Sequence, residues 1–282
     1  MKITGEPTMA PGSFTQCSSI MKSYFYSFAL FLISVSFVQA SVLVTNGLTH
    51  RHDVRGVDKE TGYIVLKNIG DEPERVLVYF KDLNVGCTGS HQYLEAGSTE
   101  RSNASWLKVG FEERILQPGE EFPMRYEVNV PKKPLKGSFW SLIMVEVKKP
   151  IDTTQLEYGV RVSSNVRYAI QIITDFEPAV AANVEFESVE MRQGPHGDYI
   201  DVTLKNFGDM VLIPEVKIEV YNASGELVLE KKADTKKLYP TQCRAYQVPV
   251  QELEKGKYQG VLVADCGESD LFGMTLNLEV DD

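Results

Sequence analysis

Apolar and polar residues alternate along most of this chain, with the period of two that is typical of strands with one buried face. Two of the alternating runs end in nearly the same six residues, LKNIGD at 66–71 and LKNFGD at 204–209. Asn-x-Gly-Asp supplies the Asx-turn chemistry and the backbone freedom that reverse a chain, and a further alternating run follows each copy. We therefore expect one structural unit of strand, turn and strand that is used twice.

Further short motifs recur in the same order after each of the two copies. A Leu-x-Pro triplet stands at 116–118 and at 238–240, and a Lys-Gly-x-aromatic run stands at 136–139 and at 255–258. The first copy carries extra residues before its Leu-x-Pro triplet, in a stretch from 82 to 105 that is rich in Gly, Ser, Thr and Asn. This stretch predicts a loop with one short strand.

Short alternating runs fill both halves of the chain and predict an all-β fold. In the first half we expect a broken strand over 41–56, a hairpin-like pair at 61–68 and 75–82, and strands near 112–116, 122–130, 138–147 and 159–173. In the second half we expect seven strands, near 184–191, 198–206, 213–221, 226–232, 242–249, 257–265 and 271–280. Turn signals about every ten residues indicate two tandem immunoglobulin-like β-sandwich domains, 41–175 and 184–282, joined by a linker at 176–183.

The start of the chain predicts export. Met21 begins a segment with one early cation, Lys22, an apolar run over 24–38 and the small-residue pattern that ends at Ala40. This is the form of a cleaved signal peptide, with residues 1–20 as an upstream extension before the expected start at Met21. The apolar run is shorter than the roughly 20 residues that a spanning helix needs, so we expect no membrane span after cleavage.

The composition argues against several classes of function. A net charge of −10 disfavours association with nucleic acid, where positive charge drives binding. The chain contains no phosphate-binding Gly-rich loop, no His-Glu-x-x-His and no Gly-x-Ser-x-Gly elbow, so we expect neither an enzyme nor a cofactor. His50 and His52 would share one face of a strand, but too few further ligands lie near them, and we expect no metal site.

Three cysteines follow Ala40, and an odd number in an exported protein leaves at least one thiol unpaired or shared between chains. Cys243 and Cys266 fall in the same repeat, on or just after consecutive expected strands, and are candidates for a disulfide within one domain. Cys87 stands in the extra stretch of the first repeat, without neighbours that would make it a nucleophile.

Several short motifs of the first half resemble one family. SWL at 105–107, LQPGE at 116–120, VP at 130–131 and GSFW at 137–140 resemble the first domain of periplasmic pilus-assembly chaperones. They also resemble the related N-terminal domains of exported bacterial immunoglobulin-like surface proteins. The resemblance covers about residues 41–175 and rests on strand and turn landmarks of a fold.

The resemblance implies a non-enzymatic role in which the long last strand of the first domain, 159–173, adds its edge to the sheet of a client. The family anchors the terminal carboxylate of the client with an Arg in the first strand and a Lys in the last. Arg51 matches the Arg, Asn165 stands where the Lys is expected, and Arg167 follows on the same face. With Arg161, which shares that polar face, these are the expected client-binding residues.

We therefore expect a protein of the periplasm or cell surface that binds an exported protein client or surface subunit, in a chaperone-like or surface-assembly role. The alternative is a structural or adhesive surface module that binds protein or glycan. A soluble client bound along 159–173 would favour the first reading, and retention by cell-wall or host polymer would favour the second.

Overall fold

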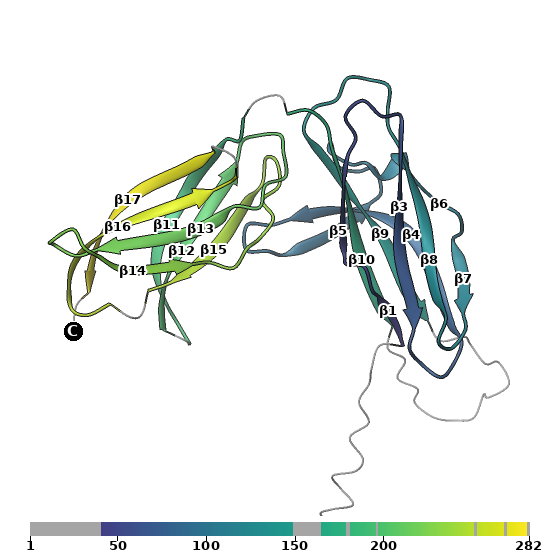
Figure 1. Ribbon diagram of the computed structural model, residues 1–282, viewed down its shortest axis with the longest axis horizontal. Helices are drawn as coiled ribbons and strands as arrows, with labels where there is room; N and C mark the ends of the chain where they lie inside the picture. The colour runs from purple at the N-terminus through teal and green to yellow at the C-terminus, as the bar shows by residue number, and fades with distance from the viewer. Residues whose placement is uncertain are drawn as a thin grey trace, which may run out of the picture. The chain divides into compact units, whose positions relative to one another are not determined.

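The computed structural model describes residues 41–148, 165–178, 181–195, 197–250, 253–267 and 270–280. Almost every element among them is a β-strand, and the exception is the short 3₁₀ helix η2, Ala104–Trp106. The contacts gather Ser41–Asp282 into one compact unit, in which the strands form two sandwiches (Figure 1). No helix in the described part of the chain is long and apolar enough to cross a membrane. The all-β class with two sandwiches is confirmed, whereas the expected signal peptide lies outside the described residues.

Strands of the first half build two sheets that face each other. One sheet has the order β1-β3-β8-β6, with bounds Val42–Val44, Lys59–Asn68, Glu121–Asn129 and Leu107–Val109. The other has the order β2-β10-β9-β4-β5, with bounds Thr49–Asp53, Val166–Asp175, Ser138–Lys148, Glu74–Val85 and His91–Glu95. A further strand of this sheet, β7 (Glu113–Leu116), pairs with β4 but is not part of that order. The expected last strand over 159–173 is described from Val166 onward and ends at Asp175, and its first part lies outside the described residues.

The core of the first sandwich consists of side chains at alternate positions of its strands. Ile64 on β3 and Met124 on β8 are fully buried, and they face Ile170 and Ile172 of β10 across the sandwich core. Burying one aliphatic side chain contributes about 1.5–3 kcal/mol, so a strand that presents such residues at every second position is held to one face.

The second sandwich also contains two sheets. One has the order β11-β12-β15, with bounds Val184–Gly194, Gly197–Asn206 and Cys243–Pro249. The other has the order β14-β13-β16-β17, with bounds Leu227–Lys232, Glu215–Tyr221, Gly256–Asp265 and Leu271–Val280. All seven strands lie where the alternation predicted them, and each expected boundary falls within three residues of the observed one.

A buried asparagine in the first copy of the repeated phrase holds the turn together. The side-chain amide of Asn68 has no exposed surface, and it donates to the carbonyl oxygens of Glu72 at 2.9 Å and Leu116 at 3.1 Å. Its amide oxygen accepts from the backbone N–H of Gly70 at 2.9 Å. The asparagine thus closes its own turn and ties that turn to the Leu-x-Pro triplet, which lies far ahead in the sequence.

The second copy repeats these contacts. Asn206 is fully buried, donates to the carbonyl oxygens of Met210 at 2.8 Å and Leu238 at 3.2 Å, and accepts from the N–H of Gly208 at 2.8 Å. The phrase and the triplet therefore recur together because one side chain joins them in each sandwich.

The turn after each Leu-x-Pro triplet needs a left-handed backbone at its next residue. Gly119 has φ 74° and donates to the carbonyl of Asn68 at 3.0 Å. Thr241 takes the equivalent place with φ 64° and donates to the carbonyl of Asn206 at 2.9 Å. A β-branched residue rarely adopts this conformation, so the second sandwich holds Thr241 in it through the same hydrogen bond that glycine makes freely in the first.

The repeated phrase does not form a hairpin, and the expected hairpin-like pair at 61–68 and 75–82 is wrong. β3 and β4 belong to different sheets, and so do β12 and β13. The polar groups of the turn are bound by the asparagine and the Leu-x-Pro turn, so the following strand crosses to the opposite sheet instead of returning beside its predecessor.

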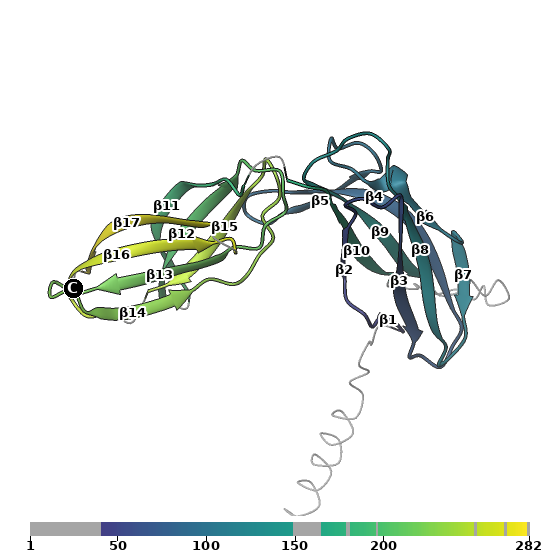
Figure 2. The ribbon, with the colours of Figure 1, turned by 45° about the horizontal axis from the view of Figure 1, so that its top comes forward.

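A disulfide joins the two sandwiches. Cys87, which lies between β4 and β5, is bonded to Cys243 at the start of β15, and the carbonyl of Cys87 accepts from the N–H of Ala245 at 2.8 Å. Figures 1 and 2 show the β4–β5 hairpin reaching from the first sandwich to the second. The expected pairing of Cys243 with Cys266 is therefore wrong. Cys266 is free because it follows β16, which belongs to the other sheet of its sandwich.

A small apolar core lies where the sandwiches meet. The indole ring of Trp140 and the phenol ring of Tyr239 have their centroids 4.9 Å apart, and the Trp140 N–H donates to the carbonyl of Leu83 at 2.9 Å. Ile173 of β10 and Val211 of the second sandwich are buried in the same cluster. This contact buries side chains that the alternation had placed on the polar face of β10.

Candidate functional site

The last strand of the first sandwich has a free edge. β10 pairs with β9 along its whole length, from Val166 to Asp175. On its other side it pairs with β2, in parallel, only from Gln171 onward. Among the described residues, no strand therefore covers this side of β10 between Val166 and Ile170.

The direction of the backbone groups shows which residues present this edge. The N–H of Gln171 donates to the carbonyl of Leu48, and the carbonyl of Asp175 accepts from the N–H of Val54, so both residues point away from β9. Backbone groups of residues two apart in a strand point the same way. Arg167 and Ala169 therefore turn their N–H and C=O groups toward the free edge, whereas the backbone of Val166 faces β9.

A shallow hollow of about 240 Å³ lies beside this edge, on the face of the sheet turned away from the core. Its lining combines aromatic and aliphatic surface with two cations, and the residues are Tyr79, Lys81, Tyr93, Met144, Arg167 and Ala169. They come from four neighbouring strands, β4, β5, β9 and β10. The surface can therefore accept apolar side chains of a ligand while the strand edge offers backbone hydrogen bonds.

The two cations of this hollow each have a carboxylate partner, Glu95 for Lys81 and Glu146 for Arg167. Glu146 of β9 is nearly buried, and it forms ion pairs with Arg167 and Lys148, each at 3.4 Å. The hydroxyl of Tyr79 donates to the same carboxylate at 3.3 Å, and burial, followed by the charge of Glu146, raises the pKa of Tyr79. Arg167 is thus held against the sheet by a partner of its own.

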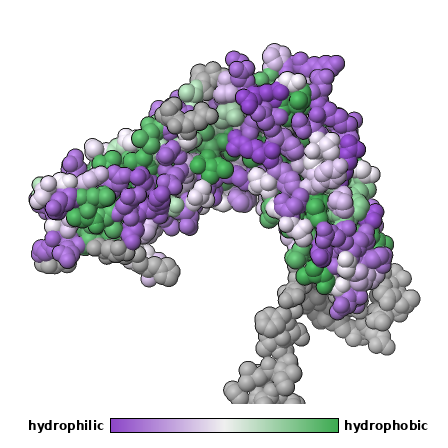
Figure 3. Space-filling view, viewed as in Figure 1, coloured by the Kyte–Doolittle hydropathy of each residue, from purple (hydrophilic) through white to green (hydrophobic). Residues whose placement is uncertain are grey.

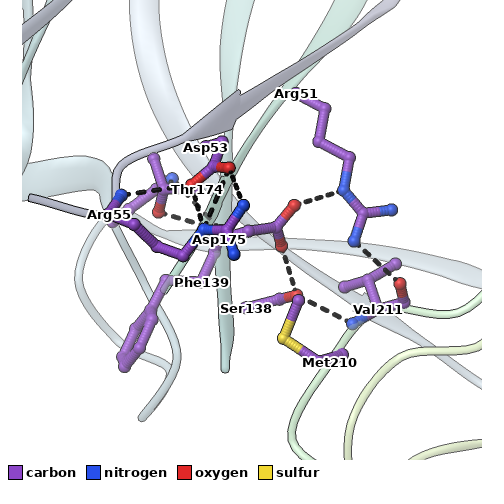
Figure 4. Close-up of polar contacts among 10 residues, drawn as sticks. Arg51, Asp53, Arg55, Ser138, Phe139, Thr174, Asp175, Met210 and Val211 are labelled. Carbon is purple, nitrogen blue, oxygen red and sulfur yellow. Dashed lines mark hydrogen bonds and ion pairs between the residues drawn. The ribbon is translucent and has the colours of Figure 1, made fainter. Parts of the chain in front are cut away.

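Arg51 lies at the other end of β10, in a network that joins the two sandwiches. Figure 4 shows its guanidinium donating to the carboxylate of Asp175 and to the carbonyl of Val211. Ser138 bridges the same groups, because its hydroxyl donates to Asp175 at 2.5 Å and accepts from the N–H of Val211 at 2.8 Å. The network fixes Arg51 beside the last residues of β10.

Lys237, from the second sandwich, approaches the same end of β10. Its ammonium donates to the hydroxyl of Thr49 at 2.6 Å and to the amide oxygen of Gln171 at 2.9 Å. Burial, followed by the nearby charge of Arg51, lowers the pKa of Lys237. Both of these acceptors are neutral, so within the described part of the chain this half-buried cation has no carboxylate partner.

The expected client-binding residues are separated in the structure. Arg51 stands beside Ile173 in the β2–β10 register, and Arg167 lies six residues earlier, a distance of about 20 Å along a strand. Asn165 is exposed just before β10 begins, and Arg161 lies outside the described residues. The cation that accompanies Arg51 is Lys237, which was not among the expected residues because nothing in the local pattern places residue 237 beside β10.

The two histidines of β2 take part in packing. The imidazole of His52 lies 2.7 Å from the hydroxyl of the buried Tyr126, and both His50 and His52 meet the Tyr126 ring edge-on. Burial lowers the pKa of His52. The described residues bring together one group of three potential metal ligands, Cys87, Glu187 and Cys243, and its two sulfur atoms are bonded to each other.

Exposed hydrophobic residues do not by themselves mark the site. Figure 3 shows hydrophobic residues interrupting a largely hydrophilic surface on both sandwiches. Tyr93 in the hollow is 50% exposed, and Tyr63, on β3 of the opposite sheet, is exposed to the same extent. The site is distinguished by three features together: a strand edge with which no described strand pairs, the hollow, and a half-buried cation.

Comparison with protein-family models finds no match, and comparison with curated proteins finds none either. Solved structures similar to the chain include chaperones of fimbrial assembly. A chaperone in a tip-adhesin complex of CFA/I fimbriae biogenesis has 14% sequence identity and a TM-score of 0.48, with 84% of this chain and 98% of that chain covered. The CsuC chaperone in complex with CsuE, from Csu pili of Acinetobacter baumannii, has 13% identity and a TM-score of 0.45, with 83% and 98% covered. The YadV chaperone has 10% identity and a TM-score of 0.44, with 85% and 100% covered.

Proposed function

We propose that this protein is an exported, non-enzymatic binding factor that takes up a protein client by strand addition at the free edge of β10. The observation that carries the proposal is the outward direction of the backbone groups of Arg167 and Ala169, with which no described strand pairs. An unpaired row of N–H and C=O groups is a template for another strand. In such complexes the main chain supplies affinity, and pockets for alternate side chains supply specificity.

The hollow beside the edge fits this mode of binding. Side chains of an added strand alternate between the two faces of the sheet. Those on the outer face would lie next to Arg167 and Ala169, and a long apolar side chain there would reach Met144, which is paired with Ala169 on β9 and whose thioether group suits apolar partners. Those on the inner face would cover Tyr168, which packs only partly buried against the first core.

The cations at the far end of β10 suit the terminal carboxylate of the client. Lys237 is half-buried and lacks a carboxylate partner among the described residues, so an anion would offset part of the cost of its desolvation. Arg51 lies close enough to add to the attraction. We infer that Arg51 and Lys237, from the two sandwiches, together anchor this carboxylate.

This placement fixes the direction of the client strand. If the C-terminal carboxylate of the client lies beside Gln171, the client residues before it lie first beside Ala169 and then beside Arg167. The client strand would therefore run parallel to β10 and continue the line of β2, which is also parallel and begins at Thr49. The sequence resemblance suggests that the client is an exported subunit of a surface structure, met in the periplasm or at the cell surface.

We expect Ala169→Pro to abolish most client binding while the protein stays folded. The N–H of residue 169 points to the free edge, so proline removes a donor from that edge and leaves the β9 ladder intact. The lost hydrogen bond and the obstructing ring should weaken binding at least about tenfold. The client is first identified by mass spectrometry of what co-purifies with the tagged protein from its native envelope, and its affinity is then measured by calorimetry.

Ala169→Val is the matched control, because it enlarges the side chain and keeps the N–H. A folded Ala169→Pro protein that binds the client as tightly as the parent would refute strand addition. Retention of the parent and of Ala169→Pro alike by an envelope polymer, without a protein client, would favour the adhesive module instead.

We expect Lys237→Gln to weaken binding of a client peptide that ends in a free carboxylate. A charge-assisted hydrogen bond contributes about 1.5–3 kcal/mol, so the loss should be about tenfold or more. The same peptide with an amidated C-terminus should bind the parent and Lys237→Gln equally. An equal loss for both peptides would show that Lys237 acts only on the fold, while strand addition could still hold.

A further inference from the structure

The last strand of the second sandwich is a second free edge, remote from the candidate site. β17 ends the sheet β14-β13-β16-β17 and pairs with β16 through all ten of its residues, Leu271–Val280. Its other side has no strand partner among the described residues. This edge belongs to the second sandwich, whereas β10 belongs to the first.

The direction of the backbone groups of β17 follows from the turn that precedes it. The N–H of Cys266 donates to the carbonyl of Asp270 at 3.0 Å, so Asp270 and every second residue after it face β16. The intervening residues turn their N–H and C=O groups to the open side, and these are Leu271, Gly273, Thr275, Asn277 and Glu279.

This edge lacks the features that protect free strands. Proteins usually guard such an edge with proline, a bulge, a lysine or an inward-pointing charge. β17 has no proline, pairs with β16 without a register shift, and carries one charged residue, Glu279, near its end. A ten-residue, nearly uncharged edge is suited to pairing with another strand.

We propose that β17 pairs antiparallel with β17 of a second copy of this chain, about a twofold axis at Thr275. In this register all five open residues find partners, because Leu271 faces Glu279, Gly273 faces Asn277 and Thr275 faces Thr275 of the second copy. A shift by two residues in either direction leaves one open residue at the end of each strand unpaired. The centred register therefore makes the most backbone hydrogen bonds.

The side chains are self-complementary in the same register. On the core side, Phe272 would face Leu278 of the second copy, and Met274 would face Leu276. All four are only partly buried in the single chain, although they pack against its core. They would occupy non-hydrogen-bonded pairs, where side chains approach most closely. Pairing would thus extend the apolar core across the twofold axis.

Charge does not oppose this pairing. The two copies of Glu279 would lie at opposite ends of the paired strands, and each would face Leu271. Threonine opposite threonine, as at position 275, is a favourable cross-strand pair. The side chain of Thr275 is exposed in the single chain, so position 275 can be changed without disturbing the core. The strand that best fits the free edge of β17 is therefore β17 of a second copy.

The test introduces a charged residue at position 275 of the exported chain. The parent should be a dimer by light scattering coupled to size exclusion, with mass that falls on dilution from millimolar to nanomolar concentration. Thr275→Lys and Thr275→Glu should each be monomeric, because each places like charges opposite one another. An equal mixture of the two should recover the dimer, because lysine then faces glutamate.

Ala169→Pro is the control, and it should leave the dimer intact because it changes the other free edge. A parent that is monomeric at every concentration would overturn the proposal and leave β17 to a different partner. Dimers that persist in both single variants, or a mixture that stays monomeric, would equally overturn the pairing at Thr275.

Discussion

Replacing Cys87 and Cys243 together by serine should lower the free energy of unfolding by about 3–5 kcal/mol. The disulfide spans a sequence separation of 156 residues, for which loop-closure entropy alone gives about 5 kcal/mol. The bond also holds the β4–β5 hairpin beside β15, where the carbonyl of Cys87 accepts from Ala245. Denaturant unfolding of the oxidised parent and of the double variant measures the difference.

Loss of the disulfide should also affect the carboxylate anchor. Lys237 belongs to the second sandwich and reaches Thr49 and Gln171 of the first. Without the covalent link, this contact rests on the small apolar core around Trp140 and Tyr239 and on a few hydrogen bonds. The double variant should therefore bind a client with a free terminal carboxylate more weakly than the parent does.

Cys266→Ser is the control for both measurements. Cys266 is outside the disulfide, and burial raises the pKa of its thiol to about 11, so it is a poor nucleophile at neutral pH. Peptide mapping of the oxidised protein should find Cys87 linked to Cys243. A Cys243–Cys266 link, or an unchanged unfolding free energy in the double variant, would contradict the expected role of the bond.

Asn206→Ala should destabilise the protein by about 3 kcal/mol. The substitution leaves the N–H of Gly208 and the carbonyls of Met210 and Leu238 without their side-chain partner. Leaving buried polar groups unsatisfied costs about 1–3 kcal/mol each, although partial rearrangement and water reduce the sum. Denaturant unfolding monitored by circular dichroism measures the effect.

The first sandwich offers an internal replicate of this experiment. Asn68→Ala removes the equivalent three hydrogen bonds and should cost a similar amount. Asp71→Ala, in the same turn but at an exposed position, should change stability by less than about 0.5 kcal/mol. A loss below that level in both asparagine variants would show that the shared phrase is retained for another reason.

Local pattern predicted the elements well. The period of two located all seven strands of the second sandwich, and it identified the buried face of β10 through Ile170 and Ile172. It could do so because side chains of a strand alternate between its faces whatever the partner strands are. The repeated phrase was also correctly taken as one unit used twice, because its asparagine makes equivalent contacts in both copies.

Partners were harder to predict than elements. The turn residues suggested a hairpin between 61–68 and 75–82, whereas β3 and β4 lie in different sheets. Gln171 and Ile173 lie on the face of β10 that begins with polar residues, yet both are buried, because the second sandwich covers them. In each case the deciding contact comes from a segment more than 30 residues away.

The sequence by itself determined the all-β class, most strand positions and the face that a strand turns to the core of its own sandwich, since these depend on neighbours within a few residues. The tertiary structure decided which strand lies beside which, and hence which edges stay free. It also decided that Cys87 meets Cys243 and that Lys237 accompanies Arg51. Such pairings depend on how two complete sandwiches pack, and packing is set by the summed burial of many side chains that no short pattern contains.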